Sequence, residues 1–105
     1  MEVLDFVKTC IRRRKIFWSY HVNMRLKERF ITREAIIFSV DTYKIIEEYP
    51  HDKYMPSCLI CAQYEEQPLH IHVVPDFEAD SVRIITSYRP SLEKWEADFK
   101  TRRKP

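Results

Sequence analysis

Three strand-like runs follow one another between Ser57 and Tyr88 and constrain the fold more than any other part of the sequence. They are SCLICAQY, PLHIHVV and SVRIITSY, each rich in β-branched or aromatic residues and each of ordinary strand length, roughly 4–8 residues. Only the short polar stretches EEQ and PDFEAD separate them. Because consecutive strands joined by short turns pair in opposite directions, this region predicts a three-stranded antiparallel meander.

Helical periodicity and one further strand surround the meander. Apolar residues recur at helical spacing over residues 2–13 and 17–29, and Thr32 is a good N-cap for a short third helix. The run YKIIEEY predicts a fourth strand, and SLEKWEADFKTRRK, after Pro90, predicts a C-terminal helix. We therefore predict a single α+β domain over residues 1–105, with N-terminal helices packed on a four-stranded antiparallel sheet and a C-terminal helix.

The chain contains no glycine, and this excludes several classes of function. Dinucleotide-binding and P-loop sites need glycine where the backbone approaches phosphate, so oxidoreductases and transferases built on those loops are excluded. Tight turns are expected to use Asp, Asn or Pro, or to be longer loops. The net charge of +2 does not by itself predict a nucleic-acid-binding protein, but the runs RRRK and RRK are strongly basic. They are either solvated helix ends or surfaces for RNA or an acidic partner.

Cysteine content and hydropathy bear on the compartment. Three cysteines is an odd number, and the N-terminus MEVLDF lacks the basic and apolar regions of a secretory signal. No apolar run approaches the roughly 18 residues of a membrane span. We expect a cytoplasmic protein that does not insert in a membrane.

A row of basic side chains distinguishes the second predicted helix. His21, Arg25 and Arg29 are four residues apart and fall between two apolar flanks, on the side expected to face the protein. A guanidinium withdrawn from water must be paired or must line a cleft. Either the two arginines pair with carboxylates at the rim and His21 is a core histidine, or the row forms a basic floor that binds an anion.

The central strand of the meander alternates cleanly and carries two histidines on one face. His70 and His72 are two residues apart, so their imidazoles lie about 7 Å from each other, opposite the apolar face. They could bind a metal with a third ligand, act in acid–base or anion contacts, or be ordinary half-exposed strand residues. Only His21, Asp52 or a cysteine could supply the third ligand.

The two flanking strands are interpreted in the same way. Cys58 and Cys61 form a CxxC, but residues three apart on a strand point to opposite faces, so core packing is favoured over a zinc or redox pair. In the last strand, alternation predicts Thr86 and Tyr88 on one face and Arg83 on the other, the first shared with Val82 and Ile84 and the second with Ile85 and Ser87.

The order of these motifs resembles a known family. YHVNMRLKERFITREAI, IIEEYP followed by PS, QPLHIHVV and IITSYRPSLEKWEADFKTR together are similar to the family of domains of unknown function numbered 4258, over residues 16–103. The residues that carry the resemblance are His21, Arg25, Arg29, Tyr49, Pro50, Ser57, Leu69, His70, Tyr88, Pro90 and Trp95. Phe30 stands where such sequences usually have glycine, and His72 where they are usually aliphatic, which favours His70 over His72.

The resemblance implies a function. The family resembles bacterial toxin ribonucleases of the RelE, colicin and barnase type, with helices packed on a four-stranded sheet, and its genes often lie beside a zinc-finger antitoxin. The implied activity is metal-independent RNA cleavage in a toxin–antitoxin pair, with no cofactor. His21 and His70 are then the acid–base candidates and Tyr88 orients the substrate, while Arg25, Arg29 and Arg83 bind phosphate.

A second function stays open. The same fold could be a non-enzymatic binding module that sequesters a protein partner or forms a homodimer through a sheet edge. An accessory metal site at His70 and His72 is a third hypothesis. If Leu69, Ile71 and Val73 face the helices, His70 lies on the opposite face and cannot form one site with His21.

Overall fold

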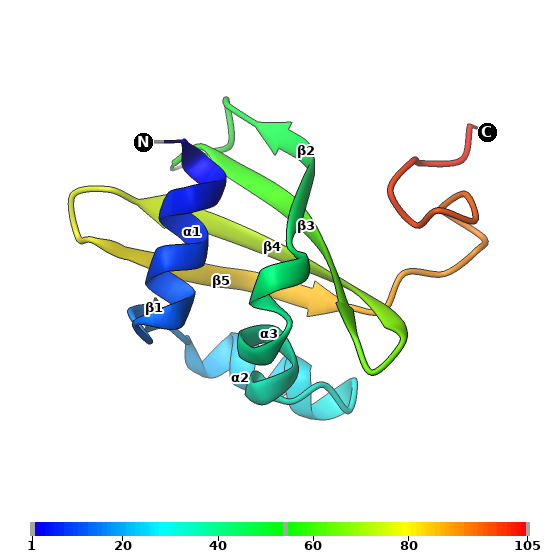
Figure 1. The fold of residues 1–105 in the computed structure, drawn as a ribbon, viewed down its shortest axis with the longest axis horizontal. Helices are drawn as coiled ribbons and strands as arrows, with labels where there is room; N and C mark the ends of the chain where they lie inside the picture. The colour runs from blue at the N-terminus through cyan, green and yellow to red at the C-terminus, as the bar shows by residue number, and fades with distance from the viewer. Residues whose placement is uncertain (1, 54, 105) are drawn as a thin grey trace.

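The computed structural model describes residues 2–53 and 55–104, which form helices on one side of a single β-sheet (Figure 1). The helices are α1 (Val3–Arg12), α2 (Tyr20–Glu28), α3 (Arg33–Phe38) and the 3-10 turn η1 (Val40–Thr42). The strands are β1 (Ile16–Phe17), β2 (Lys44–Tyr49), β3 (Ser57–Tyr64), β4 (Gln67–Asp76) and β5 (Ser81–Tyr88). The predicted meander, fourth strand and first three helices are confirmed.

The sheet has five strands in the order β1-β5-β4-β3-β2, so the prediction of a four-stranded antiparallel sheet was wrong. β1 runs parallel to β5, with Ile16 opposite Val82, whereas all other neighbours are antiparallel. The backbone N–H of Val82 also donates to the carbonyl of Lys15 (3.0 Å). β1 has only two residues, too few to show the alternation of apolar and polar side chains. Its pairing with β5 depends on where the chain leaves α1.

The core lies between the helices and one face of the sheet. α1 buries Phe6, Val7, Cys10 and Ile11, while β3, β4 and β5 bury Ile60, Ile71 and Ile84 at their centres. Leu69 and Val73 belong to the same core, which leaves the intervening histidines on the face away from the helices. Burial of these aliphatic side chains is the main force that holds helices and sheet together. No helix within the described residues is long and apolar enough to cross a membrane.

Side-chain caps set the starts of α2 and α3. The hydroxyl of Ser19 accepts from the N–H of Val22 (3.1 Å), and that of Thr32 accepts from the N–H of Ala35 (3.0 Å). The N-cap predicted at Thr32 is confirmed. α2 begins at Tyr20 rather than at Phe17, because Phe17 is part of β1.

The orientation predicted for the basic row of α2 was wrong. Val22 and Leu26 are the buried residues of the helix, whereas His21, Arg25 and Arg29 are exposed. Only one of the two apolar flanks packs, because the other flank contains Phe17, which is in β1, and Tyr20 and Met24, which are exposed. Half of the predicted apolar surface therefore faces solvent. His21 and Arg25 lie on the outer side of α2, whereas the Arg29 side chain reaches back to β5.

A β-bulge changes which side chains of β5 share a face. Thr86 is opposite His72 and Ile84 is opposite Val73, so Ile85 is an extra residue in β5. Beyond the bulge the alternation is reversed: Ser87 is buried opposite Ile71. Arg83, Ile85, Thr86 and Tyr88 consequently all belong to the face away from the helices, which simple alternation had not predicted.

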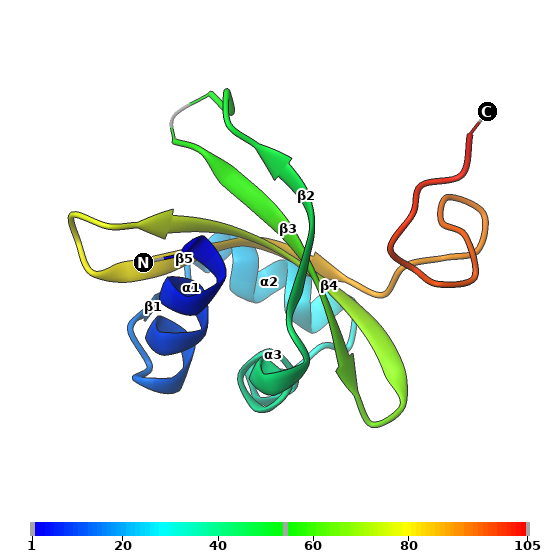
Figure 2. The same ribbon diagram turned by 45° about the horizontal axis from the view of Figure 1, so that its top comes forward.

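Residues 91–104 form turns rather than the predicted C-terminal helix. The Asp98 carboxylate accepts from the backbone N–H groups of Lys100 (2.8 Å) and Thr101 (3.0 Å), a local pattern that competes with helical hydrogen bonds. A bridge between Trp95 and Arg102 closes the loop. This C-terminal segment lies across the sheet from α1 and α3 (Figure 2), where the Trp95 side chain is buried.

Residues other than glycine adopt left-handed backbone in this chain. The β3–β4 turn consists of Glu65 and Glu66, with φ of 50° and 65°, so a two-residue hairpin turn forms without Asn or Gly. Phe30 has φ 55° directly after α2, where glycine is usual at a helix end. The expectation that tight turns would use Asp, Asn, Pro or longer loops was therefore wrong at the β3–β4 turn.

Candidate functional site

The face of the sheet away from the helices carries the polar side chains of the strands. Cross-strand pairs place Ser57 beside Tyr49, His70 beside Tyr88, and His72 beside Thr86. One half of this face, around His72, is hollowed, and the other half, around His70, is covered by the C-terminal segment.

A hydrogen-bonded series joins three side chains around His72. The Ser57 hydroxyl donates to Asp52 Oδ2 (2.6 Å), and His72 Nε2 lies 2.8 Å from the same hydroxyl oxygen. His72 Nε2 also lies 3.8 Å from Asp52 Oδ2. Ser57 is buried, and the edge of the His72 ring contacts the Tyr49 ring at 5.4 Å between centroids. The imidazole is thus held from two sides.

The direction of these bonds assigns the proton on His72. A serine hydroxyl has one hydrogen, and here it goes to the Asp52 carboxylate, which can only accept. The bond between His72 Nε2 and the Ser57 oxygen therefore needs a hydrogen on Nε2. In neutral His72, Nδ1 is the unprotonated nitrogen and the one that can take up a proton.

Burial and hydrogen bonding shift the ionisation of this series. The hydrogen bond from Ser57, together with that from the backbone N–H of Lys53, lowers the pKa of Asp52. Partial burial lowers the pKa of His72, and the nearby Asp52 carboxylate offsets part of that effect. Asp52 is therefore a carboxylate and His72 neutral near pH 7.

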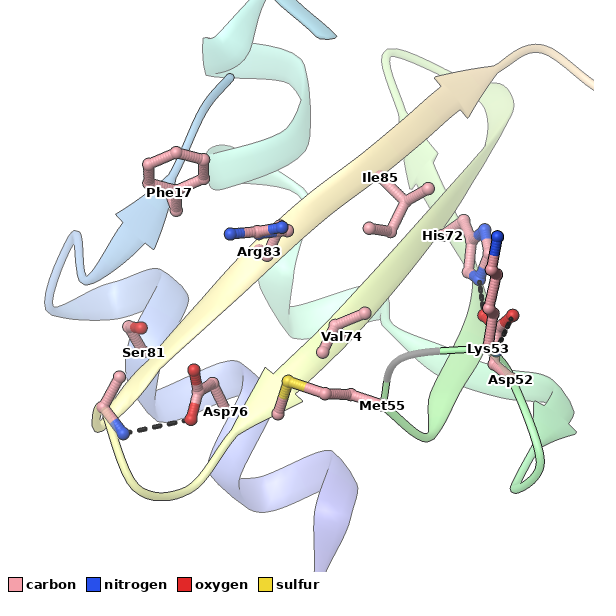
Figure 3. Close-up of a pocket in the computed structure, with 11 residues that line it drawn as sticks. Phe17, Asp52, Lys53, Met55, His72, Val74, Asp76, Ser81, Arg83 and Ile85 are labelled. Carbon is pink, nitrogen blue, oxygen red and sulfur yellow. Dashed lines mark hydrogen bonds and ion pairs between the residues drawn. The ribbon is translucent and has the colours of Figure 1, made fainter.

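The hollow beside His72 is a trough of about 540 Å³ across β4 and β5 (Figure 3). Val74 and Ile85 lie between its two walls. Phe17 and Arg83 form one wall, with the Arg83 guanidinium 4.8 Å from the centroid of the Phe17 ring. The other wall contains His72 together with Asp52, Lys53 and Met55 from the β2–β3 loop. We call this hollow the His72 trough.

His70 has a different environment. Its ring is fully buried, and it contacts the edges of the Trp95 and Tyr88 rings at 4.5 and 5.3 Å between centroids. Nε2 lies 2.6 Å from the carbonyl oxygen of Phe99 and therefore carries a hydrogen, while Nδ1 lies 3.2 Å from the Tyr88 hydroxyl. Burial lowers the pKa of His70, although the Phe99 carbonyl acts in the opposite direction.

An ion pair closes the rim of the covered half. Arg102 donates to both oxygens of Glu47, at 2.7 and 3.1 Å, and its guanidinium lies 4.7 Å from the centroid of the Trp95 ring. The Tyr49 hydroxyl also donates to Glu47. Burial alone raises the pKa of Glu47, but the hydrogen bonds from Arg102 and Tyr49 outweigh it and hold that pKa below its ordinary value. Burial and the hydrogen bond to Glu47 raise the pKa of Tyr49 to about 12.

The structure brings some of the predicted site residues together and separates others. Arg83 lines the His72 trough, and Tyr88 contacts the buried His70. Arg29 donates to the Thr86 hydroxyl (2.8 Å) and to the Ser87 carbonyl (2.9 Å), so it connects the end of α2 to β5. His21 and Arg25 are exposed on α2. His21 and His70 do not form one site, as the orientation of Leu69, Ile71 and Val73 required.

No role for Ser57 or Asp52 beside His72 was predicted from the sequence. Alternation did place His72 on the polar face, and Asp52 was considered as a metal ligand. The series forms because the β2–β3 loop folds back over β3. Ser57 is five positions from Asp52 and fifteen positions from His72, and no spacing rule predicts either contact. Ser57 pairs with Tyr49 across β2 and β3, and this pairing was a signal that could have indicated a role for Ser57.

The cysteines and the histidines do not converge. Cys58 belongs to the core on the helix side and Cys61 does not, so the two point to opposite faces, as predicted. All three cysteines are free thiols. Over residues 2–53 and 55–104, no three His, Cys, Asp or Glu side chains are grouped so that they could hold a metal ion.

Comparison with known proteins gives one match. The family model described as "Domain of unknown function (DUF4258)" matches residues 18–89. The matched segment runs from the start of α2 to the end of β5 and excludes Phe17 and the C-terminal segment. No curated protein and no solved structure matches the chain.

Proposed function

The chain belongs to the DUF4258 family, and we propose that it is a toxin-like ribonuclease that cleaves RNA without a metal ion at the His72 trough. One observation carries this proposal. His72 is neutral, fixed by Ser57 and Asp52, and faces a trough whose other wall carries the Arg83 guanidinium. The trough thus combines a proton acceptor with a phosphate-binding cation.

The chemistry needs a base and a fixed positive charge. His72 Nδ1 takes the proton from a ribose 2′-hydroxyl, and the 2′-oxygen attacks the adjacent phosphorus. The bond between phosphorus and the 5′-oxygen breaks, and the 5′-oxygen takes a proton from a water molecule. The resulting hydroxide takes the proton that His72 had accepted, so that a cyclic phosphate, a free 5′-hydroxyl and neutral His72 remain. Arg83 stabilises the negative charge on the five-coordinate phosphorus. Arg83 and His72 line opposite walls of the same trough, so we expect a phosphate that enters the trough between them to contact both.

Other cations extend the proposed RNA path. Arg29 lies beside Thr86, the cross-strand neighbour of His72, and Arg25 is one turn earlier on the exposed side of α2. Both suit phosphate groups outside the trough. A ribonuclease toxin of this kind would be held inactive by an antitoxin protein that covers the trough.

Cleavage of a fluorescent single-stranded RNA by the purified full-length protein in EDTA tests the proposal. We expect cleavage by the wild type and a loss of about 100-fold or more in His72→Gln. His51→Gln is the matched control, since His51 is an exposed histidine of the same β2–β3 loop and does not line the trough. His21→Ala, His70→Ala and Tyr88→Phe in the same assay test the catalytic roles predicted from the sequence. Intact RNA with wild type, or full activity in His72→Gln, would contradict the proposal.

A second candidate function is a non-enzymatic binding module that recognises a protein partner or a second copy of the chain. The position of β2 as an outer strand of the sheet favours it, because an outer strand can pair with another chain. An apolar hollow of about 280 Å³ adjoins the end of β2, lined by Val3, Pro50, Met55, Pro56 and Phe77 among others. Expression in a bacterial host separates the two functions: a ribonuclease degrades total RNA and stops growth, whereas a binding module leaves both unchanged.

A further inference from the structure

We infer that the His72 trough holds one unstacked nucleobase of a single-stranded RNA against Phe17, and that Phe17 and Arg83 are the residues that recognise it. This inference rests on the proposed function, because it specifies the RNA that the same site takes. It assigns a role to β1, the strand that the sequence pattern did not predict.

The shape and polarity of the trough suit a nucleobase. Its volume of about 540 Å³ falls in the range of small-ligand sites, roughly 300–1,000 Å³. Val74 and Ile85 form the apolar floor of the trough. Ile85 faces the trough because it is the extra residue of the β5 bulge. A flat, apolar ring system fits such a surface, whereas a phosphate group alone would leave the exposed Ile85 side chain uncovered.

The wall formed by Phe17 and Arg83 offers the contacts that nucleic acid needs. Phe17 is 51% exposed although it is a large aromatic residue, and the Arg83 guanidinium lies against its ring. Bases of single-stranded nucleic acid stack on aromatic rings and on arginine planes, and arginine also pairs with the adjoining phosphate. A base stacked on the wall formed by Phe17 and Arg83 would extend over Val74 and Ile85 toward His72 on the other wall (Figure 3).

The geometry also favours single strands. A base enters the trough only if it leaves its stack, which is least costly in single-stranded RNA. Carboxylates of Asp52 and Asp76 line the trough as well, so a phosphate is directed to the Arg83 side rather than to the carboxylate side. Double-stranded RNA is expected to bind more weakly than a single strand of the same sequence.

Binding of a short RNA that cannot be cleaved tests the inference independently of catalysis. The probe is an RNA that carries a 2′-O-methyl group at every position and a fluorophore, and a second probe lacks one base. We expect Phe17→Ala to weaken binding of the complete probe about tenfold or more. The missing base should weaken binding to wild type but make little further difference to Phe17→Ala. Phe17→Trp should keep wild-type affinity, which separates stacking from a folding defect.

Phe38→Ala is the matched control, because Phe38 is also exposed but lies at the end of α3. Equal affinity of wild type and Phe17→Ala would overturn the base site, even if RNA is still cleaved and the proposed function stands. Phe17-dependent binding without cleavage would support the base site and refute the ribonuclease. No binding of the probe by wild type would overturn the inference.

Discussion

His70 and His72 lie two residues apart on the same strand and the same face, yet their environments differ. His70 is fully buried, both of its ring nitrogens have partners, and it lies beneath Trp95 and Phe99. The side chain of His72 is 21% exposed and lies in the wall of an open trough. The difference arises from segments far away in the sequence, the C-terminal segment in one case and the β2–β3 loop in the other.

This comparison shows that strand alternation determines the face of a side chain but not its accessibility. Buried His70 makes the contacts of a structural residue, because its hydrogen bonds and ring contacts hold the C-terminal segment on the sheet. His72 has the polar partners and the open neighbourhood expected of a functional residue. Four predictions test this division between a covered half and an open half.

The largest expected effect is on stability, from Trp95→Ala. Trp95 is 2% exposed and packs against His70, and truncation of a buried tryptophan typically costs about 3–5 kcal/mol. Urea unfolding should show a loss of that order in the free energy of unfolding. Leu92→Ala is the control in the same segment, since Leu92 is 53% exposed, and it should change stability by no more than about 0.5 kcal/mol. Similar stabilities for the two variants would mean that the C-terminal segment does not cover His70 in solution.

The second prediction distinguishes the roles of the two histidines. His70→Gln should lower the free energy of unfolding by about 1–3 kcal/mol, because the partly buried carbonyl of Phe99 and hydroxyl of Tyr88 lose their imidazole partner. RNA cleavage by the folded protein should change little. His72→Gln should do the reverse, with a large loss of cleavage and a smaller loss of stability. Unfolding and cleavage are measured on both variants. A large loss of cleavage in His70→Gln, with little loss in His72→Gln, would contradict the division.

Much of the fold was predictable from the sequence because local patterns encode it. The alternation of β4, the cap at Thr32 and the apolar spacing of α1 are signals within a few residues of each other, and they were interpreted correctly. β1 and the β5 bulge were missed because each involves one or two residues whose pairing is set by distant contacts. The C-terminal segment has helical spacing at Trp95 and Phe99, but burial of Trp95 beside His70 overrides it.

The candidate site was less predictable than the fold. Arg83 was identified among the phosphate-binding candidates, and the structure places it in the trough. His72 was ranked below His70 because its position is usually aliphatic in the family. A family resemblance carries no information on which of two neighbouring histidines the chain covers. Asp52 and Ser57 approach His72 only after the β2–β3 loop has folded.

The third prediction concerns pH. Burial lowers the pKa of both histidines, so between the ordinary value of about 6.5 and the lower folded values the unfolded chain binds more protons than the folded one. Stability that is present above about pH 6.5 should therefore decrease as the pH falls below it. Urea unfolding between pH 7.5 and 5.5 measures this loss in a range above the titration of ordinary carboxylates. His70→Gln should lose less stability than wild type over that interval, and an equal loss would exclude His70 as its source.

The smallest expected effect comes from the rim of the covered half. Arg102 bonds both oxygens of Glu47 and stacks on Trp95, but its side chain is mostly in solvent, so Arg102→Ala should cost no more than about 1 kcal/mol. The loss should shrink at high salt, since salt screens an exposed ion pair. Arg103→Ala is the control, because its partner Glu96 is more exposed than Glu47, and the substitution should have a smaller effect. A loss as large as that of Trp95→Ala would show that the ion pair, rather than the buried rings of Trp95 and His70, holds the C-terminal segment on the sheet.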